Sequence, residues 1–192
     1  MVVNPVLQSL LSRQSLGGKH LIEPGPDDEA LALMAEAALH APDHGRLVPF
    51  RFVVVRGEQR QRLAALFVAA ARDAGKDEAG ARIDAERALR VPVSVAVLAR
   101  IDLGHPQVPA HEQWCAVGGA LASFMHAAHA LGFAGKMLSG SKVRHPAIQA
   151  AFCAPGDTLL GWISLGTAAR PLGRVARGME RDSVIRPWGP GT

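Results

Sequence analysis

Three short segments carry the side chains best suited to hold a ligand. The first is Arg13-Gln14-Ser15, a polar turn that follows a short apolar stretch. A guanidinium and a neighbouring hydroxyl can hold a phosphate through charge-assisted hydrogen bonds. An Arg-x-Ser sequence is also common in solvated turns, so this segment alone leaves both interpretations open.

The second segment contains His40 and His44. These histidines flank Pro42, which ends a helix, and a helix-to-loop corner of this kind often contacts ligands. We favour a ligand-binding role for the pair slightly over a purely structural one.

A metal site is the alternative use for histidines in this chain. His126 and His129 lie three residues apart on one helix, and a metal ion there would need a third ligand such as His111 or Cys115. Both candidates lie about three to four turns away along the same helix, too far to share an ion. We therefore expect no metal and interpret His126 and His129 as hydrogen-bonded helix residues.

The third segment is a glycine-rich strand, Gly132-Phe133-Ala134-Gly135-Lys136-Met137-Leu138-Ser139-Gly140. Glycines inside a strand indicate that a flat ligand or another backbone lies close. The alternative is a tight bend at the end of a buried helix. Common enzyme signatures are missing: the sequence has no G-x-S-x-G, no P-loop, no G-x-G-x-x-G after a strand and no C-x-x-C.

The elements that position these segments follow from hydrophobic periodicity and from the positions of proline and glycine. We predict helices over residues 4–11, from Asp27 or Asp28 to the stop at Pro42, and over 58–74, 76–90, 110–131 and 146–152. We predict strands over 50–55, 93–99, 133–137 and 158–165. Helices come first and then strands and helices alternate, which favours a single α+β or three-layer domain over residues 1–192.

The long helix over residues 110–131 is unusually thin in its middle. Gly118, Gly119, Ala120, Ala122 and Ser123 carry small side chains or none, which lets another backbone approach closely. We therefore expect this helix to be packed on nearly every side.

Composition excludes several classes of protein. The chain has 192 residues, 48% of them hydrophobic and 20% charged, which fits a globular domain and not a disordered one. A net charge of +4 is small, the basic residues are scattered, and aromatics make up only 5%, so nucleic-acid binding is disfavoured. A mildly basic enzyme with an anionic ligand is the simpler interpretation.

Several features bear on where the protein works. The apolar stretch over 114–138 contains two histidines and a lysine, and no signal peptide is evident, so we expect neither a membrane partner nor export. The chain has two cysteines, Cys115 and Cys153, and a reducing cytoplasm in which both stay free is the simplest setting.

Five segments, taken in order, resemble the nitroreductase family, in its branch of small NAD(P)H nitroreductases. They are LLSRQS at 10–15, APDH at 41–44 with PFRF at 49–52, PAHEQ at 109–113, the glycine-rich strand at 132–140 and LGT at 165–167. Each motif is weak alone, but their shared order is specific, and the likeness runs from about Leu7 to Thr167.

The resemblance implies an α+β nitroreductase-like fold, with a central mixed sheet flanked by helices and a long buried central helix. It implies a homodimer with two FMN molecules at the subunit interface, each touched by both chains. NAD(P)H would deliver hydride to the flavin, and a nitroaromatic, quinone or similar acceptor would then collect the electrons by ping-pong turnover. No side chain needs to act as acid or base, so no catalytic residue is expected.

The resemblance also carries cofactor-binding positions onto this chain. The first segment matches the turn at the flavin phosphate and ribityl chain, the second matches another contact segment, and the third matches the strand along the isoalloxazine ring. The residues are Arg13, Gln14, Ser15, His40, His44, Met137, Leu138 and Ser139.

Some positions depart from the family pattern. Gln14 and His40 stand where the branch has arginines, Met137-Leu138 replaces an aromatic-arginine pair, and Val48 replaces a glutamine. Charge at the phosphate is therefore reduced. We hypothesise that an arginine of the C-terminal segment restores it, the candidates being Arg170, Arg174 and Arg177.

Other functions stay open at this point. The substitutions favour, to a small degree, a flavin-binding or scaffold dimer without efficient turnover. A flavin enzyme with different chemistry, such as reductive dehalogenation or flavin breakdown, is a further alternative, but no inserted lid segment is evident in the sequence.

Overall fold

The computed structural model describes residues 4–171, 184–185 and 187–189. Its α-helices are α1 (Pro5–Ser12), α2 (Asp28–Leu39), α3 (Gln59–Asp73), α4 (Glu78–Arg90), α5 (Ala110–Ala130) and α6 (Pro146–Phe152). Its strands are β1 (Leu21–Ile22), β2 (Phe50–Arg56), β3 (Val93–Arg100), β4 (Ala134–Leu138) and β5 (Asp157–Ala168). Short 3₁₀ turns are η1 (Gly18–His20), η2 (His44–Arg46) and η3 (Ser141–Arg144). Every helix and strand expected from the sequence is present, and β1 is an addition.

The strands form one sheet in the order β1-β5-β3-β2, and β4 pairs with β5 on the edge opposite β3. The sequence led us to expect a mixed sheet, but every ladder between these strands is antiparallel. Within the described part of the chain, parallel pairing is limited to one bridge between Ser15 and Gly135. The reason is that β5 inserts between β3 and β4, the two strands that α5 connects, and so separates the parallel pair.

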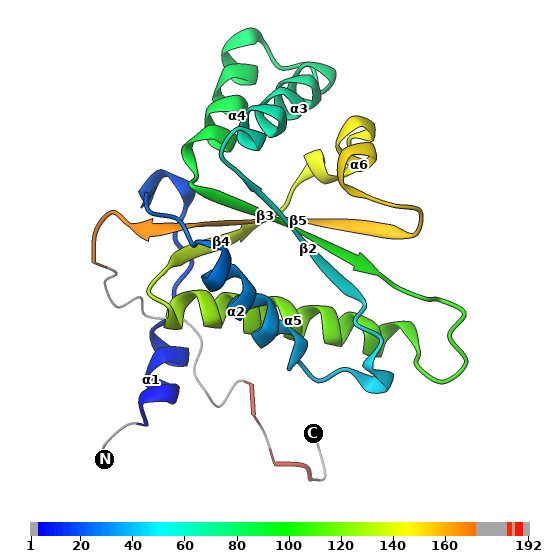
Figure 1. Ribbon diagram of the computed structural model, residues 1–192. Coiled ribbons are helices and arrows are strands. Elements are labelled where there is room, and N and C mark those ends of the chain that lie inside the picture. Colours follow the sequence, from blue (N-terminus) through cyan, green and yellow to red (C-terminus); the bar gives the residue numbers. More distant parts are fainter. Residues whose placement is uncertain (1–3, 172–183, 186, 190–192) are drawn as a thin grey trace.

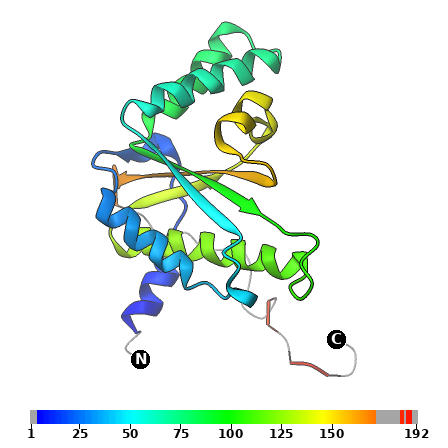
Figure 2. The same cartoon turned by 45° about the vertical axis from the view of Figure 1, so that its right-hand side comes forward.

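Helices cover both faces of the sheet (Figures 1 and 2). On one face, α2 and α5 pack against Val95 and Ile163, with Met34 and Phe124 completely buried. On the other face, α3, α4 and α6 pack against Leu98 and the neighbouring apolar residues. The alternation of side chains along β3 sends its odd-numbered residues to the first face and its even-numbered residues to the second.

The long helix α5 is covered on one face only within the single chain. Ala116, Ala120 and Phe124 are buried against the sheet and α2, whereas Trp114 and Gly118 on the opposite face are exposed. The expectation that this helix is packed on nearly every side therefore does not hold for one chain alone. The reason is that α2 and the sheet lie on the same side of the helix, and no described segment covers the middle of its opposite face.

Helix α1 is also largely uncovered. It begins at the Asn4 cap, whose side chain accepts a hydrogen bond from the Val6 amide, and none of its residues is buried. Leu7 and Leu11 are exposed even though they belong to the apolar stripe of the helix. Figure 1 places α1 beside the C-terminal end of α5.

Two glycines allow β4 to lie close to β5. A side chain at Gly135 would collide with the carbonyl oxygen of Ser164, and a side chain at Gly161 would collide with that of Leu138. Gly161 also has φ near +146°, where side-chain-bearing residues are strained. The glycine-rich segment is thus a site of close backbone approach, which is one of the two interpretations of its sequence.

Candidate functional site

The outer edge of β4 is open over most of its length. Ser15 forms a bridge with Gly135, and the Leu16 amide donates to the Gly135 carbonyl oxygen at 3.0 Å. Beyond that bridge, no other described strand pairs with the outer edge of residues 136–138, and Ser139 follows as an exposed residue. The backbone N–H and C=O groups of this edge can therefore hydrogen-bond to a ligand.

The predicted site residues of β4 face both sides of the sheet. Met137 is paired with Ile163 and faces the α2–α5 side, whereas Leu138 is paired with Trp162 and faces the α3–α4 side. Leu138 is 40% exposed and so offers an apolar surface to a ligand.

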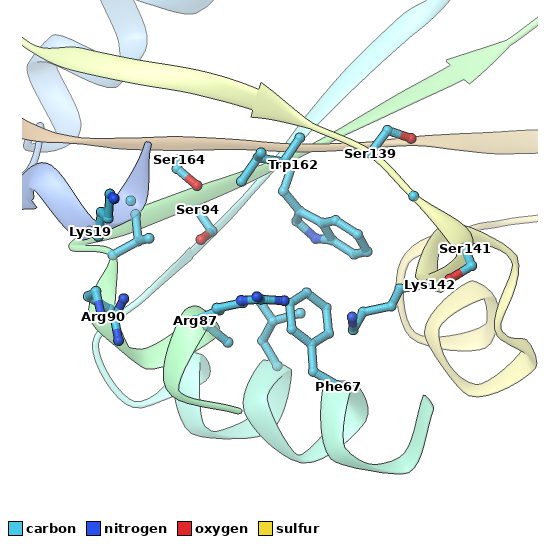
Figure 3. A pocket seen from close by; sticks show the side chains of 16 residues that line it. Lys19, Phe67, Arg87, Arg90, Ser94, Ser139, Ser141, Lys142, Trp162 and Ser164 are labelled. Carbon is cyan, nitrogen blue, oxygen red and sulfur yellow. The ribbon is translucent and has the colours of Figure 1, made fainter. Parts of the chain in front are cut away.

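A pocket of about 530 Å³ opens at the C-terminal end of β4, between the sheet and the α3–α4 pair (Figure 3). Leu138 and Ser139 contribute to its wall. The Phe67 and Trp162 rings meet edge to face with centroids 5.1 Å apart. Trp162 is 7% exposed, and its Nε1 is buried without a hydrogen-bond partner in the described structure.

Among the described residues that line the pocket there are several cations and no carboxylate. Figure 3 shows Arg87 and Lys142 beside the two aromatic rings, with Lys19 and Arg90 near the opposite end. A cavity with an aromatic wall and several cations suits a planar ligand that carries negative charge or electron-rich carbonyl groups.

One buried carboxylate forms ion pairs with two of the cations that line the pocket, Arg87 and Lys142. Asp84 is completely buried, and it pairs with Lys76 at 2.7 Å and with Arg87 and Lys142 at 3.0 Å each. Burial opposes ionisation of this carboxyl group, but hydrogen bonds and charge from the two lysines outweigh it and hold the pKa of Asp84 below its ordinary value. The cluster joins α4 to η3, the turn that follows β4.

The first predicted segment lies at the other end of β4. Arg13 is half-buried, and its Nη1 is buried without a hydrogen-bond partner among the described residues. Gln14 is half-buried and Ser15 is exposed. The bridge between Ser15 and Gly135 therefore brings the first and third predicted segments together.

Two helix histidines lie beside Arg13. His129 Nε2 is 2.9 Å from Ser12 Oγ, and the Ser12 hydroxyl also donates to the Ser9 carbonyl oxygen at 3.1 Å. Burial, and then the positive charges of Arg13 and His129, hold the pKa of His126 below its ordinary value. The described residues contain no group of three or more His, Cys, Asp or Glu side chains that could hold a metal ion.

The second predicted segment is not brought to the same place within one chain. His40 is exposed at the C-terminal cap of α2, and His44 Nδ1 pairs with Glu112 Oε2 at 2.6 Å. Glu112 lies in the first turn of α5, whereas His126 and His129 lie near the end of that helix. At 1.5 Å per residue, the two groups are about 20 Å apart along the helix axis.

Sequence reasoning missed most of the pocket. Lys19, Phe67, Arg87, Lys142 and Trp162 come from separate elements, and none stands in a motif. On a helix such as α4, alternating charges predict a solvated face. Sequence position could have suggested two of these residues, because Lys142 lies two residues after the glycine-rich segment and Lys19 lies four residues after the Arg13 turn.

The structure describes only one of the three C-terminal arginines that were expected to restore charge at the phosphate. Arg170 is described and exposed, whereas Arg174 and Arg177 lie outside the described residues. No described hydrogen bond or ion pair joins Arg170 to the Arg13 turn. Among the described residues, no helix is long and apolar enough to cross a membrane.

Comparison with known proteins identifies the class. The sequence model of the nitroreductase family matches residues 20–167, so the chain belongs to the nitroreductase family. It is 34% identical over 162 residues to the Escherichia coli K12 protein named "Putative NAD(P)H nitroreductase YdjA", covering 84% of this chain and 87% of that one. It is also 34% identical over 180 residues to a Haemophilus influenzae protein named "Putative NAD(P)H nitroreductase", and the match covers 93% of this chain and 97% of that one.

Solved structures confirm the nitroreductase-like fold. A nitroreductase-like family protein from Bacillus cereus has a TM-score of 0.79 at 17% identity and covers 98% of this chain and 99% of its own. A Desulfovibrio desulfuricans protein of the nitroreductase type, solved in complex with FMN, has a TM-score of 0.70 at 22% identity and covers 97% and 99%. The α+β architecture expected from the sequence is therefore confirmed, and family membership supports an oxidoreductase.

Proposed function

We propose that this protein is an FMN-dependent NAD(P)H oxidoreductase. One observation carries the proposal. The open edge of β4 runs from a buried arginine donor at Arg13, which has no partner among the described residues, to a cationic, aromatic-walled pocket at Leu138 and Ser139. FMN presents the same sequence of features, with a phosphate at one end, a flexible polar chain and a planar ring with carbonyl groups at the other.

The residues present fit this group. Arg13 Nη1 and Trp162 Nε1 are buried donors without partners in the described structure. Burying an unsatisfied donor costs about 1–3 kcal/mol, so such groups indicate a ligand that accepts hydrogen bonds. A phosphate oxygen suits Arg13, and a carbonyl oxygen suits Trp162. The FMN found in solved relatives supports the same assignment.

The chain's own groups have distinct roles in the proposed site. Arg13, Gln14 and Ser15 hold the phosphate and ribityl chain. Leu138 provides an apolar wall on the pocket side of β4, and Met137 flanks the same strand edge on the opposite face. The backbone from Lys136 to Ser139 offers hydrogen bonds along the ring edge. The pocket cations favour negative charge on the ring, which lowers the cost of reducing it. When bound, FMN supplies the chemistry of accepting hydride from a nicotinamide and passing electrons onward.

The proposal includes a homodimer in which His40 and His44 contact the flavin held by the other chain. Two observations support it. Within one chain, His44 pairs with Glu112 and so lies about 20 Å along α5 from the Arg13 turn, at 1.5 Å per residue. In addition, the exposed faces of α1 and α5 present Leu7, Leu11 and Trp114 to solvent, which suits burial in a subunit interface.

NAD(P)H is the proposed reductant, and nitroaromatics, quinones or similar small molecules are the proposed acceptors, by ping-pong turnover. The names of the curated relatives support the choice of reductant. The site has no described carboxylate on its pocket wall, so anionic acceptors are not repelled. Cys115 and Cys153 are both free, which fits the proposed reducing, cytoplasmic setting.

The test begins with flavin. Purified protein is incubated with excess FMN and desalted, and we expect it to retain the visible absorbance band of oxidised flavin. NADH and NADPH oxidation is then followed with menadione or nitrofurazone as acceptor. Arg13→Ala should lower flavin retention, whereas Arg82→Ala, at an exposed position on α4, should not. A correctly folded protein that binds no flavin would overturn the proposal. Flavin retention without turnover would instead support the alternative of a flavin-binding scaffold dimer.

A further inference from the structure

A compact group of basic side chains lies at the C-terminal end of α5. His126 and His129 stand three residues apart on that helix, so their side chains share one face. Ser12 and Arg13 approach this face from the end of α1, and Ser12 Oγ lies 2.9 Å from His129 Nε2. We define these four residues as the α1–α5 basic cluster.

The cluster has cationic groups but no anion to balance them. Arg13 and His129 are the charged or titratable groups that act on His126 among the described residues, and both add positive charge. The remaining member, Ser12, is neutral. Like charges placed together destabilise a fold unless an anion neutralises them.

The hydrogen-bonding pattern also indicates that the cluster binds an anion. Arg13 Nη1 is buried without a partner in the described structure. The Ser12 hydroxyl can donate its one proton to the Ser9 carbonyl oxygen at 3.1 Å, which leaves His129 Nε2–H to donate to Ser12 Oγ. His126 makes no hydrogen bond to another described side chain. Donors of Arg13 and His126 are thus available on the same side of α5.

We propose that His126 completes a phosphate-monoester site with Arg13, that Ser12 and His129 position this site, and that phosphate binding is coupled to protonation of His126. This inference rests on the proposed function, because the phosphate is that of FMN. Protonated His126 would supply the positive charge that Gln14 does not carry. In this arrangement the charge comes from α5 and not from the C-terminal arginines.

The direction of the pH dependence follows from the charges. A phosphate binds more tightly when the His126 imidazole is protonated, so affinity rises as pH falls. Burial, Arg13 and His129 lower the pKa of His126 in the ligand-free protein. A bound phosphate opposes the repulsion from Arg13 and raises that pKa, so binding takes up a proton. The phosphate itself loses charge below its second pKa of about 6, so the effect is measured above that value.

The experiment compares FMN with riboflavin, which has the same ring but no phosphate. Dissociation constants are measured by flavin fluorescence quenching between about pH 8.5 and about pH 6.5. We expect FMN affinity to rise about threefold over this range. A one-unit rise in the pKa of a histidine on binding gives at most tenfold, and only part of this is reached at pH 6.5 because the pKa of ligand-free His126 is lowered. Riboflavin affinity should change by less than about twofold, because riboflavin brings no charge that couples to the His126 imidazole.

Three variants sharpen the test. His126→Gln should weaken FMN binding near pH 6.5 and flatten its pH profile, while leaving riboflavin binding unchanged. His126→Arg should retain tight FMN binding and remove the pH dependence, because its charge is permanent. His111→Gln, at an exposed position near the other end of α5, is the matched control and should behave as the wild type.

Inorganic phosphate separates this inference from the proposed function. We expect phosphate to raise the pKa of His126, measured by NMR titration of the imidazole, and Arg13→Ala to abolish that shift. If no flavin binds but phosphate still raises the pKa, the oxidoreductase proposal fails and the anion site stands. Equal pH profiles for FMN and riboflavin, or a His126 pKa unmoved by phosphate, would overturn the inference.

Discussion

The two faces of the central sheet are built differently from neighbouring residues of the same strands. On the α2–α5 face, Val95 lies opposite Ile163, and both are completely buried. One residue earlier on β3, Ser94 lies opposite Ser164 and faces α4. The first face is a continuous apolar core, whereas the second contains a pocket and a buried charge cluster.

The difference shows how a sheet can combine a rigid side with a binding side. Large apolar side chains on the α2–α5 face fill the space between helix and strand. Two serines on the opposite face are too small to do so, and the helices above them leave a cavity of about 530 Å³. We therefore expect stability to depend mainly on the first face and ligand binding mainly on the second.

The largest expected effect is on the apolar face. Phe124 is 1% exposed and stacks on Phe52 with ring centroids 4.5 Å apart. Phe124→Ala should lower the free energy of unfolding by about 4 kcal/mol, because it removes a large buried side chain and leaves a cavity. Urea denaturation checks this value. Under conditions where the variant is folded, its flavin affinity should match that of the wild type, and a large loss would contradict the division between the faces.

A smaller loss is expected from the charge cluster on the pocket face. Asp84→Ala leaves Lys76, Arg87 and Lys142 without their shared carboxylate and should lower the free energy of unfolding by about 3 kcal/mol at neutral pH. Flavin binding should fall as well, since two of these cations line the pocket. Asp84→Asn keeps the size and shape of the side chain and removes its charge, so comparison with Asp84→Ala separates the effect of charge from the effect of packing.

The ion pairs of Asp84 should also make the free energy of unfolding depend on pH in the acid range. The pKa of Asp84 is lowered in the folded protein, so its contribution to stability is complete above the unfolded-state value of about 3.9. That contribution is lost as pH falls through the lower folded-state pKa. The stability difference between wild type and Asp84→Asn should therefore shrink in strong acid. A difference that stays constant down to about pH 2 would show that charge plays no part.

The smallest expected effect concerns one hydrogen bond. Trp162→Phe keeps an aromatic ring beside Phe67 and removes the Nε1–H, which has no partner in the described part of the chain. Stability should change by less than about 1 kcal/mol, whereas flavin affinity should fall about fivefold if the indole donates to a ring carbonyl. Thermal unfolding and flavin titration check the two parts. Equal loss of affinity for a ligand without carbonyl groups would point to ring packing instead.

The sequence predicted the elements better than it predicted the site. The continuous apolar run of β3 and the glycine that follows α5 locate those elements within a residue or two. Strand β1 has only two residues, too few to show a period, and was missed. The mixed sheet was wrong because pairing partners depend on how β5 inserts, which no local pattern encodes.

The candidate site likewise contains residues that a local motif predicts and residues that only the fold brings together. Arg13 and Leu138 could be named in advance because each stands in a short motif. Arg87 and Lys142 could not, because they are 55 positions apart and meet only through Asp84. The role proposed for His126 depends on the Arg13 turn folding back onto α5, a contact that helical periodicity alone does not predict.

The open edge of β4 also affects how the protein behaves in solution. An unpaired strand edge can template pairing with a strand of another molecule and so start aggregation. Lys136, exposed in the middle of this strand, places a charge where such pairing would begin. A ligand lying along the edge would occupy the same backbone groups, so the ligand-loaded protein should remain in solution at concentrations where the ligand-free protein precipitates.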